Sequence, residues 1–192
     1  MKRALIILVC FISITSPTYS QLEENDQYAG EGLGYFGLDV RTIENKPALF
    51  LGGGGGFIIK NFTLGVFFSG LNSPFLKTDT TNINYKLAYS YGGLEFNYTF
   101  RKSKHLNIFS GIKFNIGQTR MLDTYFVRYG KRTTYGINPQ LGIQYSVSDI
   151  FKIAFGIQYF YTYFPKSPVL YSAKDFSSPG VFLTFKLGTF KN

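Results

Sequence analysis

The segment Phe151–Tyr163, with the sequence FKIAFGIQYFYTY, carries a large apolar residue at every second position. Of the six residues between those positions, only Phe160 is both bulky and apolar. Because successive side chains of a β-strand point to opposite faces, this alternation predicts a strand with one apolar face. The segment is longer than an average strand of roughly 5–6 residues, and it is long enough for a tilted strand that crosses a bilayer.

The same alternation recurs between turn signals along the chain and gives eight predicted strands. They span residues 34–43, 47–59, 62–70, 83–100, 106–117, 133–147, 151–164 and 179–190. No stretch after residue 20 has the 3.6-residue period of an amphipathic helix, so we predict no helix there. Short connections at 61, 101–105 and 148–150 alternate with long polar ones at 71–82, 118–132 and 165–178.

The polar faces of these strands consist mostly of Gly, Ala, Ser, Asn and Gln. Small and amide side chains suit the cramped interior of a narrow barrel, whereas a soluble barrel carries Lys and Glu outside. Charged residues form only 16% of the chain and aromatic residues 19%, which is typical of a lipid-facing surface. We therefore predict an all-β fold, a single closed antiparallel eight-stranded up-and-down transmembrane β-barrel. The alternative is a soluble, secreted, lipocalin-like carrier whose apolar face surrounds a ligand.

Aromatic residues gather near both ends of the predicted strands, as the interfacial girdles of membrane barrels require. The predicted outer girdle comprises Tyr85, Tyr89, Tyr91, Tyr159, Tyr161 and Tyr163. The predicted inner girdle comprises Phe96, Tyr98, Phe100 and Phe151.

The first 20 residues have the features of a secretory signal peptide. Lys2 and Arg3 form its basic start, Ala4–Ile14 its apolar segment, and residues 18–20 a small-residue cleavage site. Such an apolar segment is too short for a membrane-spanning helix, which needs about 20 residues. The only cysteine, Cys10, lies inside it, so the mature chain would have no disulfide and no Cys-ligated metal. We expect a signal peptide at 1–20, a periplasmic segment at 21–33 and the barrel at 34–192.

Eight alternating strands, short turns opposite long loops and the terminal strand Val181–Phe190 resemble the small outer-membrane barrels of the OmpA/OmpX type. Gly52–Lys60 and Tyr91–Phe100 are similar to uncharacterised outer-membrane β-barrel proteins of Bacteroidetes. The resemblance implies the outer membrane of a Gram-negative bacterium, periplasmic termini, contact with membrane lipid and insertion by the barrel-assembly machinery. In that family the last aromatic residue faces lipid, whereas Phe190 shares the parity of Lys186. A bulge near Gly188 or a degenerate assembly signal would account for this departure.

Glycine and proline mark three irregular positions. The run Gly52–Gly56 lacks the Lys-Ser/Thr and the helix that follow a phosphate-binding loop, so we expect a bend or a strand whose missing side chains leave room for bulky neighbours. At Gly92-Gly93 the apolar residues change parity, which predicts a β-bulge. Pro139 cannot donate a ladder hydrogen bond, which predicts a bulge or a local break.

Charged residues with the parity of the polar face are expected inside the barrel: Asp39, Arg41, Glu95, Lys113, Lys152 and Lys186. Counting back from the turn at 101–105 places Glu95 opposite Gly111 and diagonal to Lys113. Barrel closure would place Asp39 and Lys186 at similar heights. Because unpaired charge in a narrow lumen is costly, we predict two ion pairs, Glu95–Lys113 and Asp39–Lys186. An interior filled in this way disfavours an open pore.

No set of residues predicts a catalytic centre, a cofactor site or a metal site. The one histidine, His105, falls in a predicted periplasmic turn, far from the outer rim where lipid-modifying barrel enzymes need theirs. Such an enzyme remains an alternative. Removing Lys2 and Arg3 leaves 18 of the 20 basic residues against 11 acidic ones, a net charge of +7. Export, and the lack of any basic run longer than two residues, argue against a nucleic-acid partner.

The predicted loop 118–132 groups four basic residues, Arg120, Arg128, Lys131 and Arg132, with three aromatic ones. Guanidinium groups bind phosphates well, so the loop is a candidate site for lipopolysaccharide or for adhesion to another surface. The alternative is a solvated loop without a ligand. Together these observations predict a structural or surface-binding envelope protein rather than an enzyme.

Overall fold

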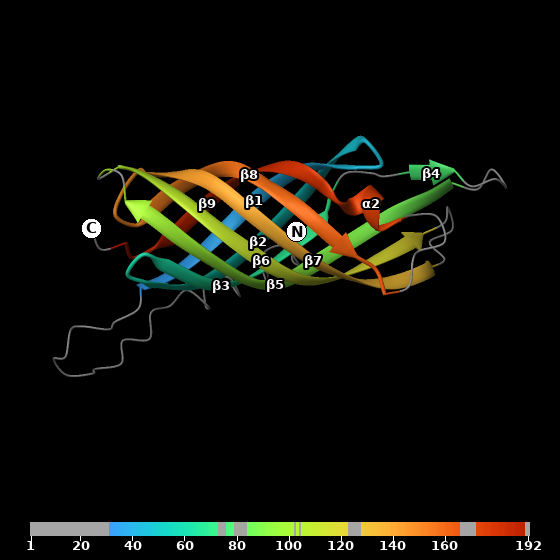
Figure 1. The fold of residues 1–192 in the computed structure, drawn as a ribbon, viewed down its shortest axis with the longest axis horizontal. Coiled ribbons are helices and arrows are strands. Elements are labelled where there is room, and N and C mark those ends of the chain that lie inside the picture. The colour runs from blue at the N-terminus through green and yellow to red at the C-terminus, as the bar shows by residue number, and fades with distance from the viewer. Residues whose placement is uncertain are drawn as a thin grey trace, which may run out of the picture.

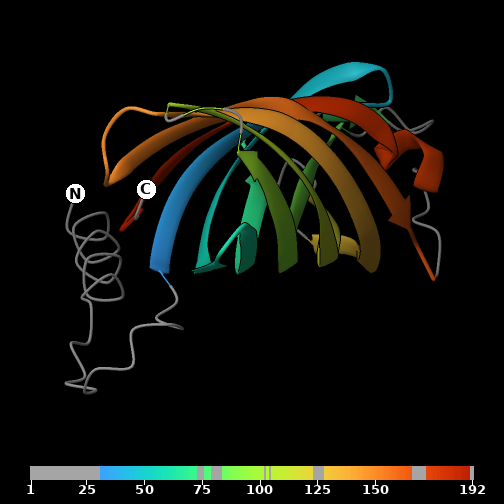
Figure 2. The same ribbon diagram turned by 60° about the vertical axis from the view of Figure 1, so that its left-hand side comes forward.

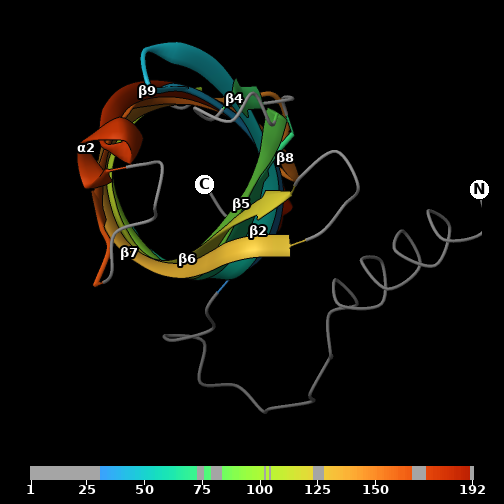
Figure 3. The same ribbon diagram turned by 90° about the vertical axis from the view of Figure 1, so that its right-hand side faces the viewer.

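The computed structural model describes residues 31–72, 76–78, 84–101, 103, 105–122, 128–165 and 172–190. Nine strands form one antiparallel sheet: β1 (Glu31–Ile43), β2 (Lys46–Ile59), β3 (Phe62–Leu71), β4 (Leu76–Thr78), β5 (Asn84–Arg101), β6 (Leu106–Leu122), β7 (Arg128–Ser146), β8 (Phe151–Tyr163) and β9 (Ser178–Gly188). Because β3 pairs with β5 as well as with β2, eight strands close into a barrel, and the short β4 extends it beside β5 (Figures 1 and 3). The prediction of a closed eight-stranded barrel is confirmed.

The predicted boundary of the barrel at residue 34 is slightly late, because β1 already begins at Glu31. The predicted signal peptide, and the predicted periplasmic segment as far as residue 30, lie outside the described residues.

The two ends of the barrel differ in their connections. At one end, which we call the turn end, lie the connections β2–β3, β5–β6 and β7–β8. The start of β1 and the end of β9 lie at the same end. At the opposite end, the loop end, lie the β1–β2 turn, the connections β3–β5, β6–β7 and β8–β9, and the helix α2 (Figures 1 and 2). The β1–β2 turn is tight because Glu44 and Asn45 have φ of 49° and 62°, the geometry that suits a two-residue hairpin.

The apolar faces of the strands point away from the barrel axis. Phe57, Val66 and Ile157 are about 60% exposed, and similar residues cover every barrel strand. The interior holds buried amides and hydroxyls, such as Asn138 and Thr134. The soluble carrier alternative, which needs the apolar face inside, is therefore wrong.

Inward-facing glycines make space for the side chains that fill the lumen. A Cβ atom at Gly54 would lie 2.6 Å from Tyr35 Oη, and one at Gly156 would lie 2.6 Å from Phe182 Cζ. At Gly54 this agrees with the interpretation of Gly52–Gly56 as a strand stripped of side chains for bulky neighbours, whereas Gly52 and Gly56 lie chiefly against the backbone of β3. The shape of the lumen is thus set by pairs of a glycine and a bulky partner.

The predicted bulge at Gly92-Gly93 is wrong, because β5 stays in uninterrupted register with both β3 and β6. Instead, Leu87, Tyr89 and Tyr91 point into the lumen and are buried. Tyr89 and Tyr91 therefore do not belong to an outer girdle, whereas Tyr161 and Tyr163 are exposed on the wall as predicted. The outward face of β5 is correspondingly weakly apolar near the loop end, where it carries Lys86, Ala88, Ser90 and Gly92.

Pro139 and the β6–β7 hairpin show where the ladder is irregular. Pro139 pairs with Ile112, but the ladder to β8 skips residues 138 and 139 and resumes in the same register. This is the predicted local break. A bulge that we did not predict lies opposite Arg120, where two residues of β7, Gly130 and Lys131, face this single residue of β6. Much of the predicted loop 118–132 is strand, since β6 extends to Leu122 and β7 begins at Arg128.

A short helix, α2 (Ala173–Phe176), lies at the loop end, so the prediction of no helix is wrong. Its signal in the sequence is Ser172-x-x-Asp175, and Asp175 Oδ2 accepts a hydrogen bond from Ser172 N at 2.6 Å. Phe176 packs edge-on against Tyr89, with 5.3 Å between the ring centroids. No helix in the described ranges is long and apolar enough to cross a membrane.

Phe190 points into the lumen at the turn end. Its side chain is buried, and Lys152 Nζ lies 4.0 Å from the ring centroid. The strand β9 keeps a continuous register with β1 and β8 up to its end, so the predicted bulge near Gly188 is wrong. Phe190 therefore faces inward because the alternation of side chains continues without interruption to the end of β9.

Candidate functional site

In the centre of the lumen, the carboxylate of Glu95 has two polar partners. Lys113 Nζ lies 3.6 Å from Glu95 Oε2, and Tyr35 donates a hydrogen bond of 2.9 Å to the same oxygen. Glu95 faces Lys113 directly, and Gly111 faces Asn97. The predicted register was thus two residues off, because the β5–β6 turn is centred one residue later in the chain than predicted, with Arg101 opposite Asn107. The two predicted partners are nevertheless brought together.

The predicted pair of Asp39 and Lys186 is wrong. The β1–β9 register places Lys186 opposite Tyr35, four residues along the strand from Asp39. Asp39 instead accepts hydrogen bonds from Gln158 Nε2 at 2.6 Å and Tyr91 Oη at 3.3 Å. Lys186 donates to Gln144 Oε1 at 3.0 Å. Neutral amides and a phenol therefore satisfy these two charges. Alternation along single strands does not reveal the strand stagger that separates Asp39 from Lys186.

Amide side chains connect the interior between these charges. Asn115 Nδ2 donates to Asn138 Oδ1 at 3.3 Å, and Gln140 Nε2 donates to Asn97 Oδ1. All four side chains are buried. Hydrogen-bonded amides that span neighbouring strands leave little space for solute in a barrel of eight strands.

The loop-end half of the lumen is closed by an arginine among aromatic rings. The Arg41 guanidinium carbon lies 3.7 Å from the ring centroid of Phe160 and 4.2 Å from that of Phe50. Tyr89 and Tyr91 add two further faces at 5.3 Å. Arg41 is 2% exposed, and its guanidinium nitrogens have no hydrogen-bond partner among the described residues. Cation–π contacts therefore hold this charge in place.

The three basic residues of the predicted outer loop whose side chains are described, Arg120, Lys131 and Arg132, do not share one face. Arg120 and Lys131 lie on the outward faces of β6 and β7, whereas Arg132 shares the inward parity of Thr134. Arg132 donates to the backbone oxygen of Lys131 at 3.2 Å. Arg128 begins β7, and its side chain lies outside the described residues. The described part of the candidate surface site thus reduces to Arg120 and Lys131.

His105 lies exposed in the β5–β6 connection at the turn end, with its ring 6.3 Å from that of Tyr145. Within the described ranges, no group of three or more His, Cys, Asp or Glu side chains is arranged to hold a metal ion. Glu95, Asp39, Lys186 and the four amides find polar partners within the lumen.

Three solved structures share this architecture. Neisserial surface protein A (NspA) matches with a TM-score of 0.54 at 11% identity, over 84% of this chain and 97% of NspA. Ail, the attachment invasion locus protein of Yersinia pestis, solved with the heparin analogue sucrose octasulfate, matches with a TM-score of 0.52 at 12% identity, over 84% and 99%. The N-terminal β-barrel domain of Pseudomonas aeruginosa OprF matches with a TM-score of 0.53 at 12% identity, over 82% and 99%.

At these identities the likeness establishes the fold. The chain has the fold of the small eight-stranded outer-membrane β-barrels. The resemblance to barrels of the OmpA/OmpX type is confirmed at this level, and the similarity to Bacteroidetes proteins stays a prediction. No protein-family model and no curated protein matches the sequence.

Proposed function

We propose that the protein is an integral outer-membrane barrel that serves the envelope through its surface, without catalysis and without a pore. The observation that carries this proposal is the opposite polarity of its two faces: the wall is apolar, and the lumen is filled with polar side chains and aromatic rings. An apolar wall is stable in lipid, and a filled eight-stranded lumen does not conduct.

In this proposal the turn end and both termini lie in the periplasm, the loop end faces outward, and the barrel-assembly machinery inserts the chain. Short periplasmic turns and longer outer loops are the rule for bacterial barrels. The single histidine then lies on the periplasmic side, away from the outer leaflet on which a lipid-modifying enzyme acts. This placement supports a role other than lipid modification.

A gel-shift assay on native membranes tests the proposal. A closed barrel resists detergent until it is boiled, so unboiled and boiled samples should migrate differently. Purified protein should also insert into phosphatidylcholine vesicles and leave their ion permeability unchanged. A protein that stays in the aqueous fraction without detergent, or one that conducts ions steadily, would refute it.

A second candidate function is contact with an anionic surface molecule such as lipopolysaccharide. Arg120 and Lys131 on the outward faces of the β6–β7 hairpin favour it, and the Ail neighbour was solved with a sulfated sugar. Exchanging Arg120, Arg128, Lys131 and Arg132 for Ser should reduce binding of lipopolysaccharide to the purified barrel. Binding that is unchanged in this variant would exclude the candidate.

A further inference from the structure

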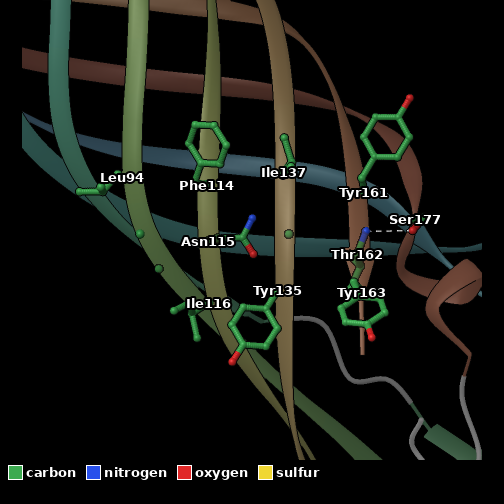
Figure 4. Close-up of a pocket in the computed structure, with 13 residues that line it drawn as sticks. Leu94, Phe114, Asn115, Ile116, Tyr135, Ile137, Tyr161, Thr162, Tyr163 and Ser177 are labelled. Atoms are coloured by element: carbon green, nitrogen blue, oxygen red, sulfur yellow. Dashed lines mark hydrogen bonds between the residues drawn. The ribbon is translucent and has the colours of Figure 1, made fainter. Parts of the chain in front are cut away.

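An apolar pocket lies on the outer wall of the barrel over strands β5 to β8 (Figure 4). It holds about 580 Å³ and is lined by outward side chains of four neighbouring strands and by glycine backbone between them. The side chains that form most of its wall are Leu94, Phe114, Ile116, Ile137, Tyr161 and Tyr163. None of them is needed to fill the lumen, because all point outward.

The hollow lies between two rows of outward side chains. The strand registers place Phe68, Gly92, Ile116 and Tyr135 in one row across the wall. From Gly92 to Tyr135 and on to Tyr163, this row forms one side of the pocket, and Gly92 leaves its β5 end open. The next row toward the turn end forms the other side, with Leu94, Phe114, Ile137 and Tyr161. The row between them, Gly93, Asn115, Gly136 and Thr162, forms the floor.

Two cations lie on the same wall, nearer the loop end. The bulge on the β6–β7 pair sets the single residue Arg120 against Gly130 and Lys131, and both charged side chains are on the outward face. Between them and the pocket lies a neutral polar row that includes Gln118. Arg120 Nη2 donates to Gln118 Oε1 at 3.0 Å, so the guanidinium is turned back toward the pocket.

This pair of like charges has no acidic neighbour on the described part of its wall. In the described parts of β5, β6 and β7, the outward faces between the pocket and the loop end contain Lys86 but no Asp or Glu. Like charges placed directly opposite each other destabilise a sheet, and a bound anion removes that cost. Guanidinium and ammonium groups together suit a phosphate.

We propose that the pocket and this basic pair bind one molecule, a membrane lipid with a phosphate headgroup. Its hydrocarbon chain fills the pocket, and its phosphate lies between Arg120 and Lys131. The inference rests on the proposed membrane location and gives the surface-binding candidate a defined site. Ile116 and Arg120 are four residues apart, about 13 Å along a strand. The Arg120 side chain bends back over part of this distance. A lipid whose chain lies in the pocket can therefore place its phosphate beside the guanidinium, within a headgroup layer that is roughly 5–8 Å deep.

Native mass spectrometry of the purified barrel in dodecyl maltoside tests this site. The protein is titrated separately with dimyristoyl phosphatidic acid, dimyristoyl phosphatidylcholine and inorganic phosphate. We expect phosphatidic acid to bind at least about tenfold more tightly than either other probe, since it alone offers both an accessible phosphate and a chain. The double variant R120Q/K131Q should lose that preference. I116W should weaken the binding of both lipids, because the larger side chain fills the pocket.

The matched control is K46Q/K60Q, which removes the same charge from β2 and its turn, away from the pocket. It should bind phosphatidic acid as the native chain does. Equal binding of the two lipids, undiminished preference in R120Q/K131Q, or an equal loss in the control would overturn the proposal. Heat-modifiability verifies that each variant is folded. Because the titration is done in detergent, its failure is distinct from failure to insert into phosphatidylcholine vesicles, which would refute the proposed function.

Discussion

Glu95 and Lys113 face each other directly across β5 and β6, and Lys113 Nζ lies 3.6 Å from Glu95 Oε2 in the buried centre of the lumen. Removing one member of a buried ion pair leaves an uncompensated charge, which costs about 3–5 kcal/mol. We expect E95Q and K113Q each to lower the free energy of unfolding in vesicles by about 3 kcal/mol. The double variant should lose less than the sum of the two, and strictly additive losses would contradict the pairing.

The aromatic cage of Arg41 provides a test of lumen closure. R41A removes the side chain that four rings surround, and the remaining void should admit ions. R41M keeps most of the side-chain volume and should stay closed. Planar-bilayer recordings would show discrete conductance for R41A and none for R41M or the native protein. Silent recordings from a folded R41A variant would mean that the seal lies elsewhere in the lumen.

The glycines that face bulky lumen residues should not tolerate a methyl group. A Cβ atom at Gly54 meets both Tyr35 and the β3 backbone, so G54A should lower the free energy of unfolding by about 1–3 kcal/mol. G32A is the matched control, because nothing lies within 4 Å of its added carbon. It should change stability by less than about 0.5 kcal/mol. Urea titration in vesicles distinguishes the two, and equal effects would refute the argument.

Substitutions on the wall measure its depth in the bilayer. Ile157 lies at the middle of β8 and is 59% exposed, whereas Ile150 lies in the connection at the turn end and is 61% exposed. In a membrane, I157R should cost about 2–4 kcal/mol and I150R at most about 1 kcal/mol. Water on the outside of the barrel would make both changes nearly neutral. The same vesicle unfolding assay tells these outcomes apart.

The number of strands, their direction and the side on which each apolar face lies were all predictable from the chain. Alternation is a local property, and the composition of the polar face decided which side was inside. The prediction for β8 is the clearest example, because every second residue of Phe155–Tyr163 is exposed on the wall. The two chemistries of wall and lumen are encoded residue by residue.

The predictions that were wrong depend on the width of the lumen and on the stagger of the strands. The parity change at Gly92-Gly93 was interpreted as a bulge because we assumed one chemistry for the whole interior, yet its loop end accepts Tyr89 and Tyr91 beside Arg41. Asp39 and Lys186 were paired by height alone, although the shear of a closed barrel separates them. The bulge beside Arg120, which forms the candidate lipid site, has its extra residue on β7 at Gly130 and Lys131, inside the segment that was predicted to be a loop.

The small and polar outward face of β5 near the loop end shortens the apolar wall on that side, whereas β8 remains apolar as far as Tyr163. A bilayer of uniform thickness does not match a belt of unequal height. The barrel must lean toward one side, or the leaflet beside β5 must thin, at a cost of fractions of a kcal/mol per ångström. Lipids of different chain length would then be distributed unevenly around the barrel, with the shortest chains enriched beside β5.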